Sequence, residues 1–205
     1  MRISFNQPAF IPWGGFFARL IRSDRMVLLD ETVLGPQKIR DLEIHEKARW
    51  ARKFLLTLRH DYGNSVHFDA VFSQLGNAAA ESGESFMSLA AGLLQILREG
   101  FGITQDFILQ SELAVTGKGT SLLVSIAREL GARDVVLPYG ADKAVDVAQF
   151  SKEDIKVFFL RYLAVPYPQF WGDFRANLSA LDLLLCAGRD GRGSIERGAR
   201  LLPAG

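Results

Sequence analysis

Residues 2–30 read RISFNQPAFIPWGGFFARLIRSDRMVLLD. The stretch opens as an apolar strand, passes through a proline- and glycine-rich loop into a short helix at 16–21, and returns to a strand before Asp30. The prolines stiffen the loop and remove backbone donors, and the glycines permit close backbone approach. This order of strand, loop, helix, strand and acid is typical of a mononucleotide-binding half unit, whose ligand lies beyond the strand ends. A rigid turn that only orients the helix is the equal alternative.

Three helices are expected in succession after this unit. Large apolar residues recur every four positions at 46–62, and similar patterns follow at 66–78 and 85–99. Because no strand separates these helices, they predict a helical lobe at about 45–100 that lies beside the first loop.

Strands and helices alternate again beyond the lobe. Strands are expected at 107–109, 134–137 and 155–162, and helices at 120–130 and 176–186. The pattern predicts an α/β fold in which a mostly parallel central sheet is flanked by helices. We expect a single domain over residues 1–205 with a flexible tail at about 188–205, because the tail is rich in glycine and arginine and lacks periodicity.

Composition and charge limit the kinds of partner. The chain has 205 residues, 48% of them hydrophobic, and its net charge of +1 gives no general attraction to nucleic acid or anionic membranes. No apolar run is long enough for a membrane span, and the single cysteine, Cys186, excludes an internal disulfide and favours a reducing cytoplasm. His45, His60 and His67 lack metal-ligand spacing, so no metal site is expected.

A further set of motifs is spread along most of the chain. Its members are Gln7-Pro8, Phe10, Pro12-Trp13, Gly15-Phe16, Asp24, Val27, Asp30, Trp50, Lys53, Tyr62, Ser111-Glu112, Leu130-Gly131-Ala132, Tyr167-Pro168-Gln169, Phe174, Leu178-Ser179, Asp182-Leu183 and Gly188. Together they resemble the WbqC-like family, bacterial proteins associated with O-antigen and other surface-polysaccharide gene clusters. The resemblance implies a transferase that moves glycine or another small acyl group onto a sugar. Its substrate would be a small molecule such as a nucleotide sugar or an activated acyl donor, while the cofactor and the oligomeric state are left unknown.

The chain departs from the family pattern in three places. The family usually carries a longer, strand-rich insert after the first acidic strand, whereas residues 30–40 here run through without it. Phe54 stands where the family often has a histidine, and Ala144 where a tyrosine is common. A mechanism that needed either of those side chains would not apply to this chain.

Asp30 is the leading candidate for a catalytic group. It directly follows the second strand, at the end where ribose-binding and catalytic acids are often found, and would act as a general base or accept a hydrogen bond from a hydroxyl. Its neighbour Glu31 is a rival for that role. Asp24, at the opposite end of the strand, is expected to cap the preceding helix or to start the strand.

The turn TGKGTS, which contains Lys118, is a candidate anion site. It is not a P-loop, because Glu112 stands where the first glycine belongs and Gly119 where Ser or Thr would bind magnesium. A lysine and two glycines nevertheless precede a helix N-terminus, where free N–H groups and the helix dipole suit an anion. A plain turn capped by Thr120 or Ser121 is the alternative.

Two proline-fixed aromatic loops are candidates for a shared pocket with one amide on each side. Separate turns that pack on the core are the equal alternative. The candidate substrate-binding residues are Gln7, Pro8, Trp13, Gly15 and Phe16 in the first loop, Tyr167 and Gln169 in the second, and Tyr139.

Ser179, Asp182 and Cys186 share one helix face by their spacing. Ser179 as a substrate contact and Asp182 as a catalytic carboxylate form one interpretation. The favoured alternative makes Ser179 the helix N-cap with Asp182 at the third helical position. Cys186 has no basic neighbour in sequence and is expected to be an unreactive, buried thiol.

Two further functions are alternatives to the transferase. An enzyme that activates a carboxylate or phosphate by nucleotidyl transfer fits the strand-loop-helix opening, but the loop lacks the two histidines common in such enzymes. A non-catalytic binding or scaffold component of a glycan pathway is the third. Such a component would not need Asp30 or Gln7 for pathway output.

Overall fold

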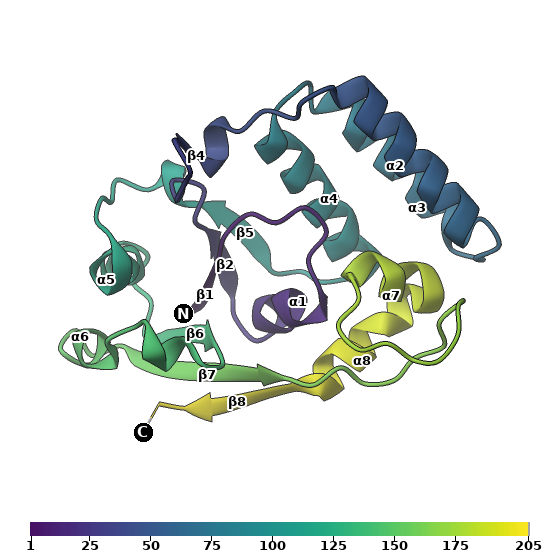
Figure 1. The fold of residues 1–205 in the computed structure, drawn as a ribbon. Coiled ribbons are helices and arrows are strands. Elements are labelled where there is room, and N and C mark those ends of the chain that lie inside the picture. The colour runs from purple at the N-terminus through teal and green to yellow at the C-terminus, as the bar shows by residue number, and fades with distance from the viewer. Residues whose placement is uncertain (205) are drawn as a thin grey trace.

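The computed structural model describes residues 1–204, and within them six strands form one central sheet (Figure 1). Five neighbouring strands run parallel and the last pairs antiparallel with its neighbour, which confirms the expected mostly parallel α/β fold. Across the sheet the order is β5 (Asp106–Leu109), β2 (Arg25–Leu28), β1 (Arg2–Asn6), β6 (Asp134–Pro138), β7 (Lys156–Tyr162) and β8 (Ala199–Pro203).

Strand β1 is the topological centre of this sheet. Ile3 pairs with Arg25 of β2 on one side and with Val135 of β6 on the other. The chain therefore proceeds outward from β1 in one direction through β2 and β5, and in the other through β6 and β7. Ligands of open α/β sheets bind at such a reversal of strand order, outside the carboxyl ends of the strands.

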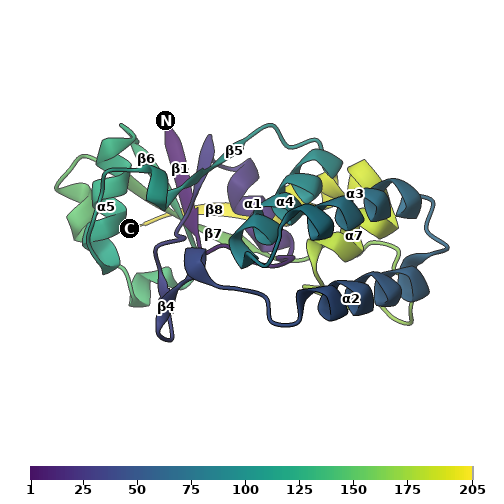
Figure 2. The same ribbon diagram turned by 90° about the horizontal axis from the view of Figure 1, so that it is seen from above.

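Helices cover both faces of the sheet, and Figure 2 separates the two layers. Helices α5 (Gly119–Glu129) and α6 (Val147–Ser151) lie on one face, over a core that includes Ile3, Phe5 and Val27. The opposite face carries α1 (Gly14–Ile21), α4 (Phe86–Gly100), α7 (Ala180–Ala187) and α8 (Gly191–Gly198).

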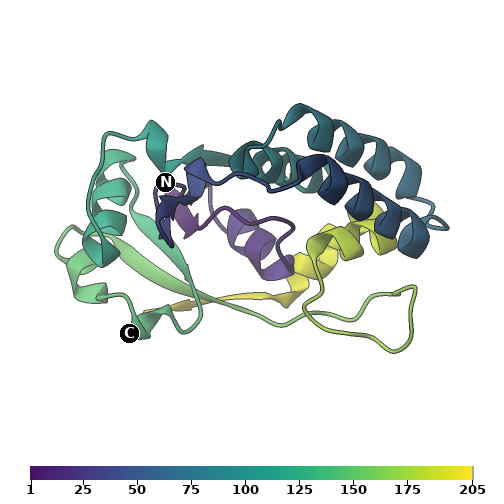
Figure 3. The ribbon, with the colours of Figure 1, turned by 45° about the horizontal axis from the view of Figure 1, so that its top comes forward.

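The predicted helical lobe is confirmed. Helices α2 (Lys47–Tyr62), α3 (Phe68–Glu81) and α4 follow one another without a strand of the central sheet between them (Figure 3). Phe10 of the first loop packs edge-on against Trp50 and Phe54, with ring centroids 5.3 and 5.4 Å apart. Part of the aromatic stripe on α2 therefore faces the N-terminal loop.

Regular secondary structure fills residues 188–203, where the sequence predicted a flexible tail. A 3₁₀ turn (Gly188–Asp190) leads into α8, and β8 then pairs with β7. Arginines made the segment look polar, but one face of α8 is buried through Ile195, and Arg192 donates a 2.6 Å hydrogen bond to the carbonyl of Gly102.

The segment after Asp30 forms a short hairpin that sequence periodicity did not reveal. Strands β3 (Val33–Leu34) and β4 (Gln37–Lys38) pair antiparallel around Gly35, whose φ of +64° suits glycine at this turn. The hairpin projects from the body of the molecule in Figure 2. In the part of the chain that the structure describes, no helix has the length and apolar character to span a membrane.

Two Gly→Ala substitutions should have opposite effects on stability. A β-carbon at Gly198 would meet the carbonyl of Leu163 and the ring of Tyr162, whereas one at Gly76 in α3 meets nothing within 4 Å. We expect Gly198→Ala to lower the free energy of unfolding in urea by about 1–3 kcal/mol, and Gly76→Ala to raise it by about 1 kcal/mol. A Gly198→Ala protein as stable as the parent would contradict this packing.

Candidate functional site

The N-terminal loop is anchored at the carboxyl end of β1. Pro8 and Pro12 are buried, and the amide of Ala180 donates a 2.7 Å hydrogen bond to the carbonyl of Pro12. Trp13 is 38% exposed and packs edge-on against Tyr162, with ring centroids 5.3 Å apart. The first loop is therefore fixed against the start of α7.

Three predicted contacts in this loop have different environments. Phe16 belongs to the first turn of α1 and is buried in the core. A β-carbon at Gly15 would come within 2.5 Å of the Trp13 ring, so a larger residue there requires the Trp13 side chain to move. Gln7 is exposed to solvent. Of the three, Gln7 is the one that a ligand reaches without rearrangement of the fold.

Asp30 is a buried carboxylate in this structure, and its catalytic role stays a prediction. It is 1% exposed, and Ser111 donates to both of its oxygens, from the amide at 3.0 Å and from the hydroxyl at 2.6 Å. Ser111 belongs to the 3₁₀ turn (Gln110–Glu112) that follows β5. Asp30 thus joins the carboxyl ends of β2 and β5. At the other end of β2, Asp24 accepts a 2.7 Å bond from the amide of Arg2.

A cavity of about 590 Å³ opens beside this junction. It lies between the β3–β4 hairpin and the turn that precedes α5, at the carboxyl ends of β2 and β5. Its lining includes Glu31, Thr32, Val33, Lys38, Gln110, Val115, Thr116, Gly117, Lys118, Gly119 and Leu122.

The Lys118 turn brings backbone amides to this cavity. Gly117 and Gly119 have φ values of +144° and +56°, and no side chain caps the first turn of α5. Capping by Thr120 or Ser121 is therefore wrong. Thr120 Oγ1 accepts a 3.0 Å bond from the amide of Asp146, and Ser121 donates to the carbonyl of Lys118 at 2.9 Å.

Charge at the hairpin is held in one cluster. Glu31 accepts hydrogen bonds from Lys38 and, at 2.5 Å, from Arg40. These two cations lower the pKa of Glu31, so its carboxylate is ionised at neutral pH and is a weak base. Glu31 can accept a hydrogen bond from a ligand more readily than it can remove a proton.

Gln110 contributes a buried amide to the same cavity. It is 6% exposed, and among residues 1–204 its side-chain oxygen has no hydrogen-bond partner. A buried, unsatisfied acceptor is costly, so an unpaired one in a cavity lining marks a place for a donor such as a hydroxyl.

Asp182 forms a second buried polar cluster, away from that cavity. It is 6% exposed and accepts hydrogen bonds from the hydroxyls of Tyr62 at 2.7 Å and Tyr167 at 2.5 Å. Burial and these bonds raise the pKa of both tyrosines. Ser179 accepts from the amide of Asp182, which confirms the predicted N-cap.

The second aromatic loop packs on α2 and α7. The Trp171 indole N–H donates to the carbonyl of Asp61 at 3.2 Å. Gln169 bonds to the backbone of Arg175 in its own loop, as donor at 2.9 Å and as acceptor at 2.8 Å. The amide of Gln169 is thus satisfied without Gln7, and a pocket shared by the two amides stays a prediction.

Tyr139 lies at the carboxyl end of β6 and is 62% exposed. The Arg161 guanidinium lies 5.6 Å from the centre of its ring. This position leaves the ring free to contact a ligand at the switch point beside β1, and that role stays a prediction.

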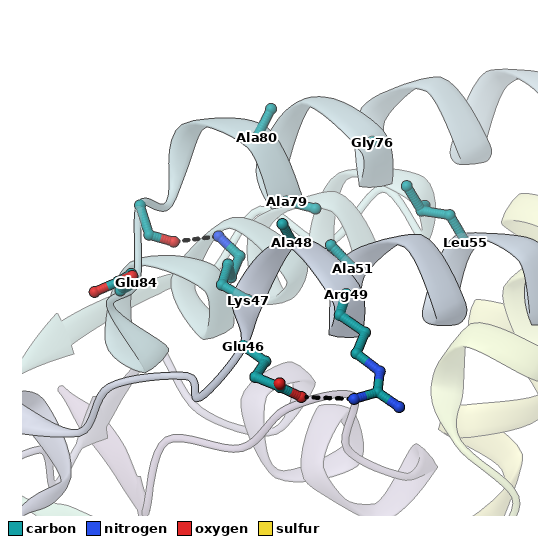
Figure 4. Close-up of a pocket in the computed structure, with 11 residues that line it drawn as sticks. Glu46, Lys47, Ala48, Arg49, Ala51, Leu55, Gly76, Ala79, Ala80 and Glu84 are labelled. Carbon is teal, nitrogen blue, oxygen red and sulfur yellow. Dashed lines mark hydrogen bonds and ion pairs between the residues drawn. The ribbon is translucent and has the colours of Figure 1, made fainter.

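A larger cavity, of about 750 Å³, lies between α2 and α3 (Figure 4). Alanine and glycine form most of its lining, and three of its four charged side chains are already paired: Lys47 with the carbonyl of Gly83, and Arg49 with Glu46 at 3.1 Å. Far from the strand ends and without an unsatisfied polar group in its lining, it is the weaker candidate.

Two of the cavity residues were missed by sequence reasoning. Lys38 belongs to the unexpected hairpin, and Gln110 follows a strand whose end was placed at Leu109. A glutamine directly after a parallel strand was a usable signal for Gln110. Within residues 1–204, no three histidine, cysteine or acidic side chains come together in a way that would hold a metal ion.

Comparison with known proteins gives a family match over most of the chain. The model of the WbqC-like protein family matches residues 31–193. The match begins after the 2–30 stretch, so it is independent of that motif. An uncharacterised protein of Mycobacterium tuberculosis, Rv1507c, is 22% identical over 220 residues, which cover 92% of this chain and 95% of that protein. No solved structure matches the chain.

Removal of either buried carboxylate should lower stability. Asp30→Asn and Asp182→Asn each place an amide N–H₂ group against hydroxyl or amide donors, so we expect each to lose about 1–3 kcal/mol in urea unfolding. Exposed Asp173 gives the matched control, and Asp173→Asn should change stability by less than about 0.5 kcal/mol. Unchanged stability in both buried variants would contradict the assigned contacts.

The thiol of Cys186 should be slow to react. Burial, with a smaller contribution from the Asp182 carboxylate, raises its pKa to about 11. Only about a thousandth of the thiol is then ionised at pH 8. We expect alkylation of the folded protein by iodoacetamide to be at least about tenfold slower at pH 8 than that of an unperturbed cysteine, and to accelerate up to pH 10. Rapid alkylation at pH 7 would contradict this.

Proposed function

Because the chain belongs to the WbqC-like protein family, we propose that it is a transferase that modifies a precursor of a surface polysaccharide or a nucleotide sugar. It binds an anionic, hydroxyl-bearing small molecule in the cavity at the carboxyl ends of β2 and β5. The group transferred is glycine or another small acyl group.

One observation carries this proposal: two kinds of recognition group line one cavity. Lys118 and the uncapped N-terminus of α5 favour an anion such as a phosphate. The buried oxygen of Gln110 and the ionised Glu31 favour hydroxyl or amine donors. A phosphate-bearing sugar presents both types of group, which supports this substrate class over a purely apolar ligand.

The chemistry would rest on positioning and on charge. The acceptor hydroxyl or amine forms a bond to the acyl carbon while the bond to the leaving group of the donor breaks. Lys118 and the α5 amides stabilise the anion that departs. Glu31 accepts a hydrogen bond from the acceptor, whose proton then passes to solvent.

Direct transfer fits the remaining side chains better than a covalent enzyme intermediate does. The Cys186 thiol is neutral at physiological pH, and the oxygens of Asp30 and Asp182 accept hydrogen bonds from the protein. Asp30 therefore supports the site as a positioning group, whereas Asp182 belongs to a separate cluster; the catalytic roles expected of both from the sequence stay predictions.

A thermal-shift titration tests the ligand class. We expect a uridine diphosphate sugar to raise the melting temperature, because a ligand at a hundred times its Kd adds about 2.7 kcal/mol of stability. Lys118→Met should weaken this ligand by about tenfold or more. Lys152→Met removes an equivalent charge from an exposed position outside the cavity lining and should leave the affinity unchanged.

The outcomes separate the three functional classes. Mass spectrometry should detect an acylated sugar when the protein is mixed with the ligand and an activated acyl donor. Release of pyrophosphate from a nucleoside triphosphate would favour nucleotidyl transfer instead. Binding without any product would favour a scaffold, and equal affinity of the Lys118→Met and Lys152→Met proteins would overturn the proposed site.

A further inference from the structure

Arg19 is a buried cation without a counter-charge. It lies in the last turn of α1 and is 5% exposed. In residues 1–204 no ion pair joins it to a carboxylate, and its Nε atom is buried without a hydrogen-bond partner. Burial lowers the pKa of Arg19 to about 10, so the guanidinium is charged at neutral pH. Buried charges are normally paired, because an unpaired one is strongly destabilising.

The partner that Arg19 does have is a neutral amide. One terminal nitrogen of Arg19 donates to the side-chain oxygen of Asn6, and the Asn6 amide nitrogen donates to the carbonyl of Gln7 at 2.7 Å. Asn6 thus holds the guanidinium and the first residue of the loop together. This arrangement orients the cation but does not neutralise it.

The position of this pair matches the place where α/β sheets bind ligands. Asn6 is the last residue of β1, which has β2 on one side and β6 on the other. Side chains on a helix lean toward its N-terminus, so Arg19 extends toward the carboxyl end of the sheet. Its helix lies on the opposite face from α5, which carries the Lys118 turn at its start.

The loop that begins at Asn6 holds a strained residue. Ile11 has a φ of +125°, which is unfavourable for a β-branched side chain, and it precedes Pro12. Such strain persists where the surrounding structure enforces it, and it gathers at ligand clamps and switch segments. The strained residue, Ile11, therefore lies in the loop before α1, and the uncompensated cation, Arg19, lies in α1 itself.

We propose that Arg19 binds an anionic oxygen group of a ligand, a phosphate or a carboxylate, at the carboxyl end of β1. Asn6 is a positioning residue that aims the guanidinium, whose planar fork suits such an anion. The ligand supplies the missing counter-charge. The site is separate from the Lys118 cavity and does not depend on the acyl-transfer proposal.

Arg19→Met tests the charge directly, because methionine keeps much of the buried stem. We expect the ligand-free variant to melt several degrees higher than the parent, since an unpaired buried charge has been removed. Arg25→Met removes an exposed arginine at the start of β2 and should melt like the parent. A lower melting temperature for Arg19→Met would assign Arg19 a structural role and overturn the proposal.

Binding is measured by thermal shift with two probes, inorganic phosphate and acetate, in the Lys118→Met protein. We expect at least one probe to raise its melting temperature, and the probe that does so identifies the anion as a phosphate or a carboxylate. Adding Arg19→Met should abolish the rise, and adding Arg19→Lys, which keeps the charge but loses the fork, should weaken the probe at least fivefold.

Two results would overturn the Arg19 site. One is the absence of any rise with either probe in the Lys118→Met protein, and the other is a rise that persists unchanged with Arg19→Lys. Both leave the proposed function standing if the parent still binds the uridine diphosphate sugar through Lys118. The opposite outcome is a rise in melting temperature that only the Arg19 variants abolish, while Lys118→Met leaves the affinity for the sugar unchanged. That outcome would support the Arg19 site and remove the Lys118 site.

Discussion

Strand β1 has a parallel partner on each side, and the rest of the structure depends on this double pairing. A strand that is hydrogen-bonded on both edges must be covered on both faces, because neither face of a parallel sheet is left to solvent. Its alternating residues meet that requirement, since Ile3 and Phe5 enter the core under α5 and α6. Ser4 and Asn6 point to the other face, where the hydroxyls of Ser4 and Ser23 lie 2.8 Å apart.

The same pairing explains where the polar groups of interest gather. Parallel strands end at one edge, and each of β1, β2 and β5 is followed there by a polar or charged side chain. β2 leads to Asp30 and Glu31, and β5 leads to Gln110 and Ser111. The hydrogen bond from Ser111 to Asp30 joins the carboxyl ends of β5 and β2, so Glu31 and Gln110 lie beside one cavity. These two polar side chains are thereby placed by the ends of sheet strands and not by long loops.

Local signals in the sequence predicted much of this fold. Helical periodicity located α2 to α4, and the capping pattern of Ser179 and Asp182 located the start of α7. Local sequence signals failed where tertiary contacts decide the structure. Helix α8 is specified by the burial of Ile195 and by the hydrogen bond from Arg192 to Gly102, two residues that are about 90 positions apart in the sequence. The hairpin was missed because two-residue strands have no period to detect.

Prediction of the site had a similar limit. Lys118 was predicted because glycines beside a lysine are a local pattern. The partners of Asp30 lie 81 residues away, so its burial could not be inferred from neighbours, and a free carboxylate was the natural expectation. The burial of Arg19 was missed because the sequence of a short amphipathic helix does not distinguish a buried arginine from a solvated one. The exposure of Arg19 is determined by the strand beneath the helix.

The contacts of Asp182 also bear on how this protein can vary. Tyr62 comes from the outermost helix of the lobe, Tyr167 from the loop after β7, and Asp182 from α7, so one carboxylate joins three distant parts of the chain. Loss of any one of the three leaves a buried polar group without its partner. Each substitution alone is therefore unfavourable, and the three positions should change together or not at all, which makes the trio a single evolutionary unit spread over 120 residues.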